Sequence, residues 1–411
     1  MRSLNIFYGW KIVGTSVLCY SASPGQFAIG AFSLFIIPLE LEFGWSRTEI
    51  AMTTAFFTIV QAIMNPMIGK LIDRQGSKEV LIPTALIFGL LLATIPLLVS
   101  EIWHLYVIYS VLGLVAGGCS AIPYLRFAAA WFNKNRGLAF GLTMSGGGLG
   151  YAYTPPMVQY MIDNYGWHSG YYVLSAVVLL VTVPLMYFVL FNKPADLNMY
   201  PDGDSSLAEQ KTDVNDEKEI PLMELLKSST FWKLYVIFAF LTFCLYGLML
   251  QLVPMLSGRG MDTTTAALAF STIGTTIIIA RIGIGYLLDK FFAPKLAMVC
   301  FLLSACGLAL LAIGATGSMV FISAVLIGFS IGAELDILAY LITRYFGLGS
   351  FGMIYGILFT SFLVGVTTGP VAYAAVYEYY GSYINMLIAC TLLLTLTAGL
   401  MLLLPKYKNE G

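Results

Sequence analysis

The sequence contains twelve long apolar stretches, each long enough to cross a lipid bilayer. The hydrocarbon core of a bilayer is about 30 Å thick, so a spanning helix needs about 20 apolar residues. A helix is suited to this setting because it satisfies its own backbone hydrogen bonds. The predicted fold is an all-α membrane protein with twelve transmembrane helices. The stretches cover residues 12–39, 48–69, 80–99, 103–130, 138–161, 170–191, 232–256, 265–288, 296–314, 318–343, 353–377 and 383–404.

The composition excludes several other classes of protein. Hydrophobic residues make up 59% of the chain and charged residues 10%, whereas about a quarter of a soluble domain is charged. The net charge of −1 gives no reason to expect a nucleic-acid partner. The six cysteines lie within the apolar stretches without metal-binding spacing, so we expect packing roles. We therefore predict a lipid-embedded protein with no metal, no cofactor and no enzymatic activity.

Positive charge is distributed unevenly along the chain. If the N-terminus lies in the cytoplasm, the inner segments hold 17 of the 21 lysines and arginines, and the outer loops hold only Arg47 and Arg259. Cytoplasmic loops of membrane proteins carry this excess. We therefore predict a multi-pass protein of the inner (plasma) membrane with both termini in the cytoplasm.

The sequence repeats across a polar linker. The segment Gly69-Lys-Leu-Ile-Asp73-Arg74 recurs as Gly285-Tyr-Leu-Leu-Asp289-Lys290, at an offset of 216 residues. A common offset and an even number of helices predict two six-helix halves in the same orientation, around a path near the bilayer midplane. The predicted domains are 1–192, a cytoplasmic linker at 193–230 with one short helix near 221–227, and 231–411.

Several motifs carry a family resemblance over essentially the whole chain. The loop from Gly69 to Lys78 resembles the signature loop of the major facilitator superfamily. Other motifs resemble monocarboxylate transporters and the related oxalate:formate exchangers, and most of all bacterial lactate/pyruvate-type carriers. These motifs are Trp131–Gly141, the glycines of Ser145–Gly150 with Pro155-Pro156, Phe231-Trp232, and Arg281 within a span. The resemblance implies transport of small monocarboxylates by alternating access.

Arg281 is the most informative single residue. It lies eight residues before Asp289, about 12 Å inside the cytoplasmic edge. A charge at this depth costs at least ~2.5–3.5 kcal/mol, so it should face a partner or a wet cavity. The guanidinium matches a carboxylate in planar, bidentate geometry, and the resemblance implies that this arginine anchors the substrate carboxylate. The alternative is a permanent salt bridge to Glu334 or Asp336.

The repeat relates Arg281 to Asn65, at the same offset of 216 residues. Asn65 should therefore face Arg281 across the pseudo-twofold axis, with Gln61 one helical turn away on the same side. This amide pair is a candidate for binding the hydroxyl or oxo group of a small acid. Alternatively, the two amides hold neighbouring helices together by hydrogen bonds. Tyr124 and Tyr340 are further candidate donors to the substrate, since each brings a hydroxyl into apolar surroundings.

Glu334 and Asp336 are candidates for carrying a proton. They lie close to the depth of Arg281, and being two residues apart on a helix they point about 200° apart. They cannot both face one cavity squarely, and fixed pairing with Arg281 or Arg126 is the alternative. Many animal monocarboxylate carriers have an aspartate four residues before the arginine and a lysine in the first span. Here Ile277 occupies the former position, and residues 12–39 contain no lysine.

A second group of charges is predicted to act during conformational change. Asp73 and Asp289 are expected just outside the inner ends of two related spans, with Arg74 beside the first. We interpret them as a latch to nearby helix N-termini or basic residues, a solvated loop charge being the alternative. Arg126 is predicted to have a gating or packing role, with pairing to Asp336 or lining of an inner vestibule left open.

The resulting hypothesis is a proton-coupled carrier of L-lactate, pyruvate or similar acids. One deep arginine balances one carboxylate, and the eleventh span lacks the lysine that oxalate exchangers add, so a monocarboxylate is favoured. The predicted partners are the acid, H⁺ and the lipid bilayer, with the monomer as the functional unit. The alternatives are an anion exchanger of the oxalate:formate type and a transport-inactive monocarboxylate sensor.

Overall fold

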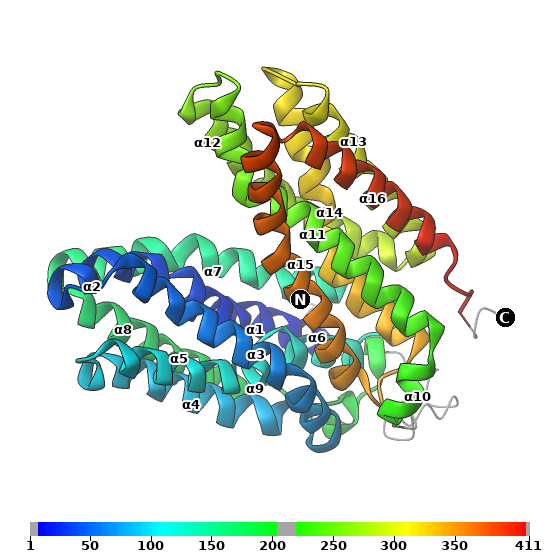
Figure 1. The fold of residues 1–411 in the computed structure, drawn as a ribbon. Coiled ribbons are helices and arrows are strands. Elements are labelled where there is room, and N and C mark those ends of the chain that lie inside the picture. Colours follow the sequence, from blue (N-terminus) through cyan, green and yellow to red (C-terminus); the bar gives the residue numbers. More distant parts are fainter. Residues whose placement is uncertain (1–6, 204–218, 408–411) are drawn as a thin grey trace, which may run out of the picture. The chain divides into compact units, whose positions relative to one another are not determined.

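The chain is built from helices (Figure 1). A computed structural model describes residues 7–203 and 219–407, and within these two ranges it contains no strand. Eleven helical spans there are long and apolar enough to cross a membrane. The remaining predicted stretch, 138–161, is also helical but less apolar, because it is rich in glycine and tyrosine. The prediction of an all-α membrane fold is confirmed.

The helices group into two compact units. The first comprises Met1–Lys218 with Leu348–Ile357, and the second comprises Glu219–Gly347 with Leu358–Gly411. The described linker residues 193–203 group with the first unit, and α10 occupies the place of the predicted linker helix. The segment Leu348–Ile357, which opens α15, also groups with the first unit. The predicted domain boundaries stay a prediction.

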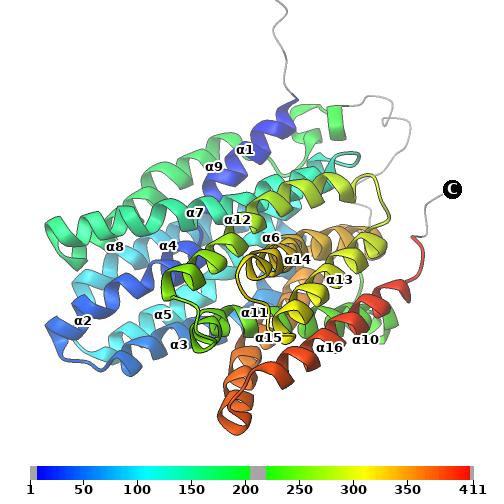
Figure 2. The ribbon, with the colours of Figure 1, turned by 90° about the horizontal axis from the view of Figure 1, so that it is seen from above.

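Figures 1 and 2 show the helices of each unit packed along one another. The helices of the first unit are α1 (Tyr8–Ser21), α2 (Ile36–Phe43), α3 (Arg47–Gln75), α4 (Ser77–Leu98), α5 (Ile102–Ala116), α6 (Ala121–Trp131), α7 (Arg136–Tyr165), α8 (Trp167–Ala176) and α9 (Val183–Val189). Those that follow are α10 (Leu222–Lys227), α11 (Ser229–Gly258), α12 (Thr263–Leu288), α13 (Ala293–Ala312), α14 (Ser318–Tyr345), α15 (Phe351–Tyr380) and α16 (Ile384–Leu402).

Three of the predicted spans are interrupted rather than continuous. The first span changes from α1 to a π-helical turn at Gly25–Gly30 and a 3₁₀ turn at Phe32–Phe35 before α2. A 3₁₀ turn at Gly117–Cys119 separates α5 from α6, and a π-helical turn at Val177–Thr182 separates α8 from α9. By contrast, α7 (Arg136–Tyr165) continues as one helix through Pro155 and Pro156.

The internal repeat is visible in the helix pairs. In the first unit α3 packs on α5 and α4 on α8, and in the second α12 packs on α14 and α13 on α16. Related side chains begin the related helices. Ser46 caps α3, accepting a hydrogen bond from the backbone of Glu49, and Asp262 caps α12, accepting one from Thr265. The two N-caps are 216 residues apart, which is the offset of the repeat.

Glycines set the closest helix contacts, and they repeat as well. A Cβ atom on Gly146 or Gly150 of α7 would lie 2.3 or 2.1 Å from the carbonyl oxygens of Val17 or Ser21 on α1. Such backbone contact is possible only where a side chain is absent. The glycines of α7 therefore permit its close approach to α1.

The same spacing occurs in the second unit. A Cβ atom on Gly365 or Gly369 of α15 would lie 2.6 or 2.3 Å from the carbonyl oxygens of Ala239 or Phe243 on α11. Both contacts therefore use glycines four residues apart on one helix against carbonyls four residues apart on the other.

We expect Gly150→Ala and Gly369→Ala each to lower the free energy of unfolding by about 1–3 kcal/mol, because the added methyl group overpacks a helix contact. The measurement is the thermal unfolding midpoint in detergent. Gly14→Ala on α1 is the matched control, since a Cβ there meets nothing within 4 Å. Equal midpoints for all three variants would contradict the packing role.

Candidate functional site

Arg281 lies in α12, and its side chain is 14% exposed. Its Nη1 atom is 3.5 Å from Oδ1 of Asp336 on the neighbouring helix α14. Charge-assisted hydrogen bonds are shorter, about 2.7–2.9 Å, and neither oxygen of Asp336 accepts a hydrogen bond from the described residues. The two groups therefore form an ion pair that lacks the close bidentate geometry of a permanent salt bridge.

The register of α12 against α14 explains why these two residues meet. A Cβ on Gly328 would lie 2.9 Å from the carbonyl oxygen of Ile273, and one on Gly332 would lie 2.7 Å from that of Ile277. Asp336 and Arg281 continue the series one turn further, because each partner is four residues later. The two glycines thus bring the helices together and set the carboxylate beside the guanidinium.

Glu334 faces a different helix. Its side chain is fully buried, and its Oε1 accepts a hydrogen bond of 2.8 Å from the hydroxyl group of Tyr246 on α11. Its Oε2 is buried without a hydrogen-bond partner among residues 7–203 and 219–407. The two acids, both fully buried, therefore point to separate partners, as their spacing on one helix predicts.

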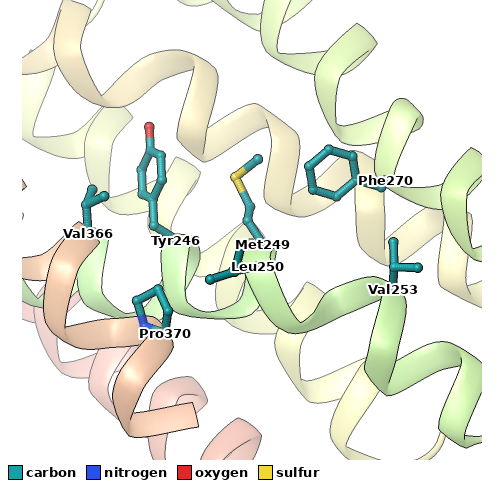
Figure 3. Close-up of a pocket in the computed structure, with 7 residues that line it drawn as sticks. All are labelled: Tyr246, Met249, Leu250, Val253, Phe270, Val366 and Pro370. Atoms are coloured by element: carbon teal, nitrogen blue, oxygen red, sulfur yellow. The ribbon is translucent and has the colours of Figure 1, made fainter. Parts of the chain in front are cut away.

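Tyr246 is a residue that the sequence reasoning missed. It connects Glu334 with a cavity of about 470 Å³ that opens within the second unit (Figure 3). The signal in the sequence was weak, since Tyr246 is one of 25 tyrosines. The cavity is lined by Tyr246, Met249, Leu250, Val253, Phe270, Val366 and Pro370.

Tyr340 and Tyr124 are both buried, at 3% and 1% exposure. The hydroxyl of Tyr340 accepts a hydrogen bond of 2.8 Å from Arg344 one turn away, and the guanidinium lies 5.0 Å from the centre of the tyrosine ring. The ring of Tyr124 lies against that of Tyr20, with centroids 5.7 Å apart. Their predicted donation to a substrate stays a prediction.

Asn65 is buried in α3, in the first unit, and its Oδ1 accepts no hydrogen bond from the part of the chain that the structure describes. This oxygen lies close to Gly117, where an added Cβ would come within 2.8 Å of it. Gln61, one turn earlier, is half-buried. That Asn65 faces Arg281 stays a prediction.

Asp73 differs from its predicted setting outside the span. It lies within α3, and its side chain is only 3% exposed. Its carboxylate accepts hydrogen bonds of 2.9 and 2.8 Å from the backbone N–H groups of Gly352 and Met353, in the first turn of α15. These are donors that a helix cannot satisfy itself, and the positive end of the helix dipole favours a carboxylate there.

Arg126 pairs with the same carboxylate. Its Nη1 donates to Oδ1 of Asp73, and its Nη2 lies 3.3 Å from the Asp73 carbonyl oxygen. The predicted gating or packing role of Arg126 stays a prediction, as does its alternative pairing with Asp336. Arg74 is exposed in the last turn of α3, and Asp289 is the C-terminal cap of α12. Their proposed latch role stays a prediction.

Among the described residues, no group of three or more His, Cys, Asp or Glu side chains is arranged to hold a metal ion. The site is instead a cation with two buried acids and an adjoining apolar cavity. Such an arrangement suits the binding of a small anion, with one charged contact and an apolar wall.

Known proteins resemble this chain along most of its length. The chain is 23% identical to "MFS transporter asaE" of Aspergillus flavus over 79% of its residues and 70% of that protein. It is 23% identical to monocarboxylate transporter 12 of Homo sapiens over 93% of its residues and 78% of that protein. Among solved structures, the proton:xylose symporter XylE superposes with a TM-score of 0.75 at 14% identity, covering 96% of this chain and 95% of that one.

The family model described as the Major Facilitator Superfamily matches residues 18–370. This match takes in the described helices from α1 to the middle of α15 and includes Asp73, Arg281, Glu334 and Asp336. The predicted superfamily is thereby confirmed: the chain belongs to the major facilitator superfamily of transporters.

Proposed function

We propose that this transporter moves a monocarboxylate together with a proton across the plasma membrane by alternating access, working as a monomer with both termini in the cytoplasm. The observation that carries the proposal is the ion pair of Arg281 with buried Asp336 at 3.5 Å. The sequence similarity to monocarboxylate transporter 12 supports the substrate class. Small monocarboxylates such as L-lactate and pyruvate are the proposed substrates.

Charge balance links the acid to the proton. In the empty carrier Asp336 neutralises Arg281, which offsets part of the cost of holding both charges away from water. A proton that binds Asp336 removes this counterion and leaves Arg281 to pair with the substrate carboxylate. The loaded site then has the same net charge as the empty site, and the monocarboxylate and H⁺ cross together without net charge.

Asp336 supplies a carboxylate that this sequence lacks at position 277. Many animal carriers of the resembling family have an aspartate four residues before the arginine, where this chain has Ile277. In the structure the backbone of Ile277 is instead the contact point for Gly332, and Asp336 supplies a carboxylate from α14. We therefore assign Asp336 as the proton carrier that exchanges with substrate, and Glu334, held by Tyr246, as a second proton-binding group.

Other polar groups are assigned supporting roles. We propose that the amides of Asn65 and Gln61 and the hydroxyls of Tyr124 and Tyr340 contact the hydroxyl or oxo group of the acid. The unsatisfied and buried Oδ1 of Asn65 supports this role, since an orphaned acceptor gains most from a ligand hydroxyl.

The contact of Asp73 with α15 is assigned to the transport cycle. We propose that Asp73, Arg126 and the first turn of α15 form a latch that breaks and reforms, with Arg74 and Asp289 acting in the same process. The latch is polar and local, so a small change in position breaks two hydrogen bonds and one ion pair at once.

Arg281→Gln should weaken binding of pyruvate and L-lactate by about 30-fold or more, because removing one partner of a buried charged contact costs 2–5 kcal/mol. Calorimetric titration and uptake of the labelled acids into proteoliposomes are the measurements. Arg259→Gln, in the same unit, is the control and should keep both the binding and the uptake of the wild-type protein. Unaltered uptake by Arg281→Gln would reject the anchor.

Asp336→Asn should abolish accumulation driven by a pH gradient while counterflow of labelled acid against internal acid continues. The amide cannot carry the proton, yet it still leaves Arg281 available to the substrate. Glu334→Gln is the matched variant, and its amide oxygen can still accept from Tyr246. If both variants accumulate acid in response to the gradient, the proton travels elsewhere. If the wild-type protein shows counterflow of acid but no accumulation in response to the pH gradient, it is an anion exchanger.

Asp73→Asn should reduce the maximal transport rate at least several-fold with little change in substrate affinity, because the amide weakens both the ion pair and the helix-terminus contact. Initial uptake rates over a range of acid concentrations separate the two parameters. Glu79→Gln, near the start of α4, is the control. A change in substrate affinity alone, with an unaltered maximal rate, would show that Asp73 does not act in the conformational step.

A further inference from the structure

We propose that the cavity beside Tyr246 receives the side group of the transported acid, so that the preferred substrates are monocarboxylates with a branched or aromatic apolar group larger than those of lactate and pyruvate. This inference rests on the proposed function, because it takes Arg281 as the anchor for the carboxylate. The inference adds the chemical class of the side group that the substrate carries beyond its carboxylate.

The lining of the cavity is almost entirely apolar. It is formed by α11, α12 and α15, and Figure 3 shows Tyr246 carrying the only hydroxyl among the seven labelled side chains. Its volume of about 470 Å³ falls within the range of small-molecule sites, about 300–1,000 Å³. A sugar or another polyhydroxylated solute would leave several hydroxyls without hydrogen-bond partners against this wall, at a substantial cost.

Two lining residues connect the cavity with the charged groups. Tyr246 donates to Glu334 on α14, and Phe270 lies about three helical turns before Arg281, on the same face of α12. From there the lining extends towards the end of α11 and the start of α12. Val253 is seven residues after Tyr246, and Phe270 is eleven residues before Arg281, or about 10 and 16 Å along the helix axes. An acid held at Arg281 can therefore direct its tail into the cavity.

The volume distinguishes small acids from larger ones. Because the carboxylate stays at Arg281, only the side group of the acid enters the cavity. That group is a single methyl group in pyruvate or lactate and a benzyl group in phenylpyruvate, so the smaller acids leave most of the cavity without contacts. Each further buried methylene group should tighten binding about fourfold.

The residue types favour rings and branched chains alike. Tyr246 and Phe270 present aromatic rings, which pack well against another ring. Met249 has an unbranched, flexible thioether that adapts to ligands of different shape. We therefore expect 4-methyl-2-oxopentanoate and phenylpyruvate to be preferred over pyruvate, which shares their 2-oxo acid group.

The test is direct binding and proteoliposome uptake of these three acids by the intact protein. Apparent affinity should rise at least tenfold from pyruvate to phenylpyruvate, with 4-methyl-2-oxopentanoate between them. Pyruvate binding that equals or exceeds that of the larger acids would overturn this inference and leave the proposed function standing. Failure of all three acids to bind would instead remove the proposed function itself.

Variants that fill the cavity give an independent readout. Val366→Phe should lower the affinity ratio of phenylpyruvate to pyruvate at least tenfold, and Val253→Phe provides the same test from α11 if the first variant does not fold. Val364→Phe is the matched control, since Val364 is on the same helix, 50% exposed and outside the lining. An unchanged ratio in a folded cavity variant would place the side group elsewhere.

Discussion

The packing of α12 against α14 is tied to the pairing of one guanidinium with one buried carboxylate. A charge among apolar helices is tolerated only with a counterion or water, and Arg281 has Asp336 at 3.5 Å. The approach of α14 to α12 at Gly328 and Gly332 makes this pairing possible. The ion pair therefore depends on the helix packing, because larger residues at the two glycines would move Asp336 out of reach of Arg281.

The repeated sequence has produced a repeated scaffold, but the ion pair occurs in one copy. Gly113 of α5 closely approaches Phe57 of α3, much as Gly328 of α14 approaches Ile273 of α12. The position that corresponds to Arg281 in the first unit is Asn65, a neutral amide. The close helix contacts therefore occur in both units, whereas the arginine at this position is found in the second.

Much of the fold follows from the sequence, and less of the site does. Apolar length predicts the helices, and spacing predicts that Glu334 and Asp336 diverge. The partner of Arg126 was not predictable, because Asp73 lies 53 residues away and the choice depends on how α3 and α6 pack. The π-helical turn at Val177–Thr182 contains neither proline nor glycine, and Pro184, which follows it, does not by itself specify a π-helical turn. Tyr246 and the cavity likewise emerge only from the packing of three helices.

The contact between Asp73 and the start of α15 joins residues 279 positions apart in the chain. A nascent polypeptide released after only its first half would lack the backbone N–H groups that this carboxylate accepts. The first unit therefore completes its own hydrogen bonding only when ribosomal synthesis has passed Met353. Assembly of the N-terminal helices consequently finishes late, and separately expressed halves would need to reassociate before the first could reach its final form.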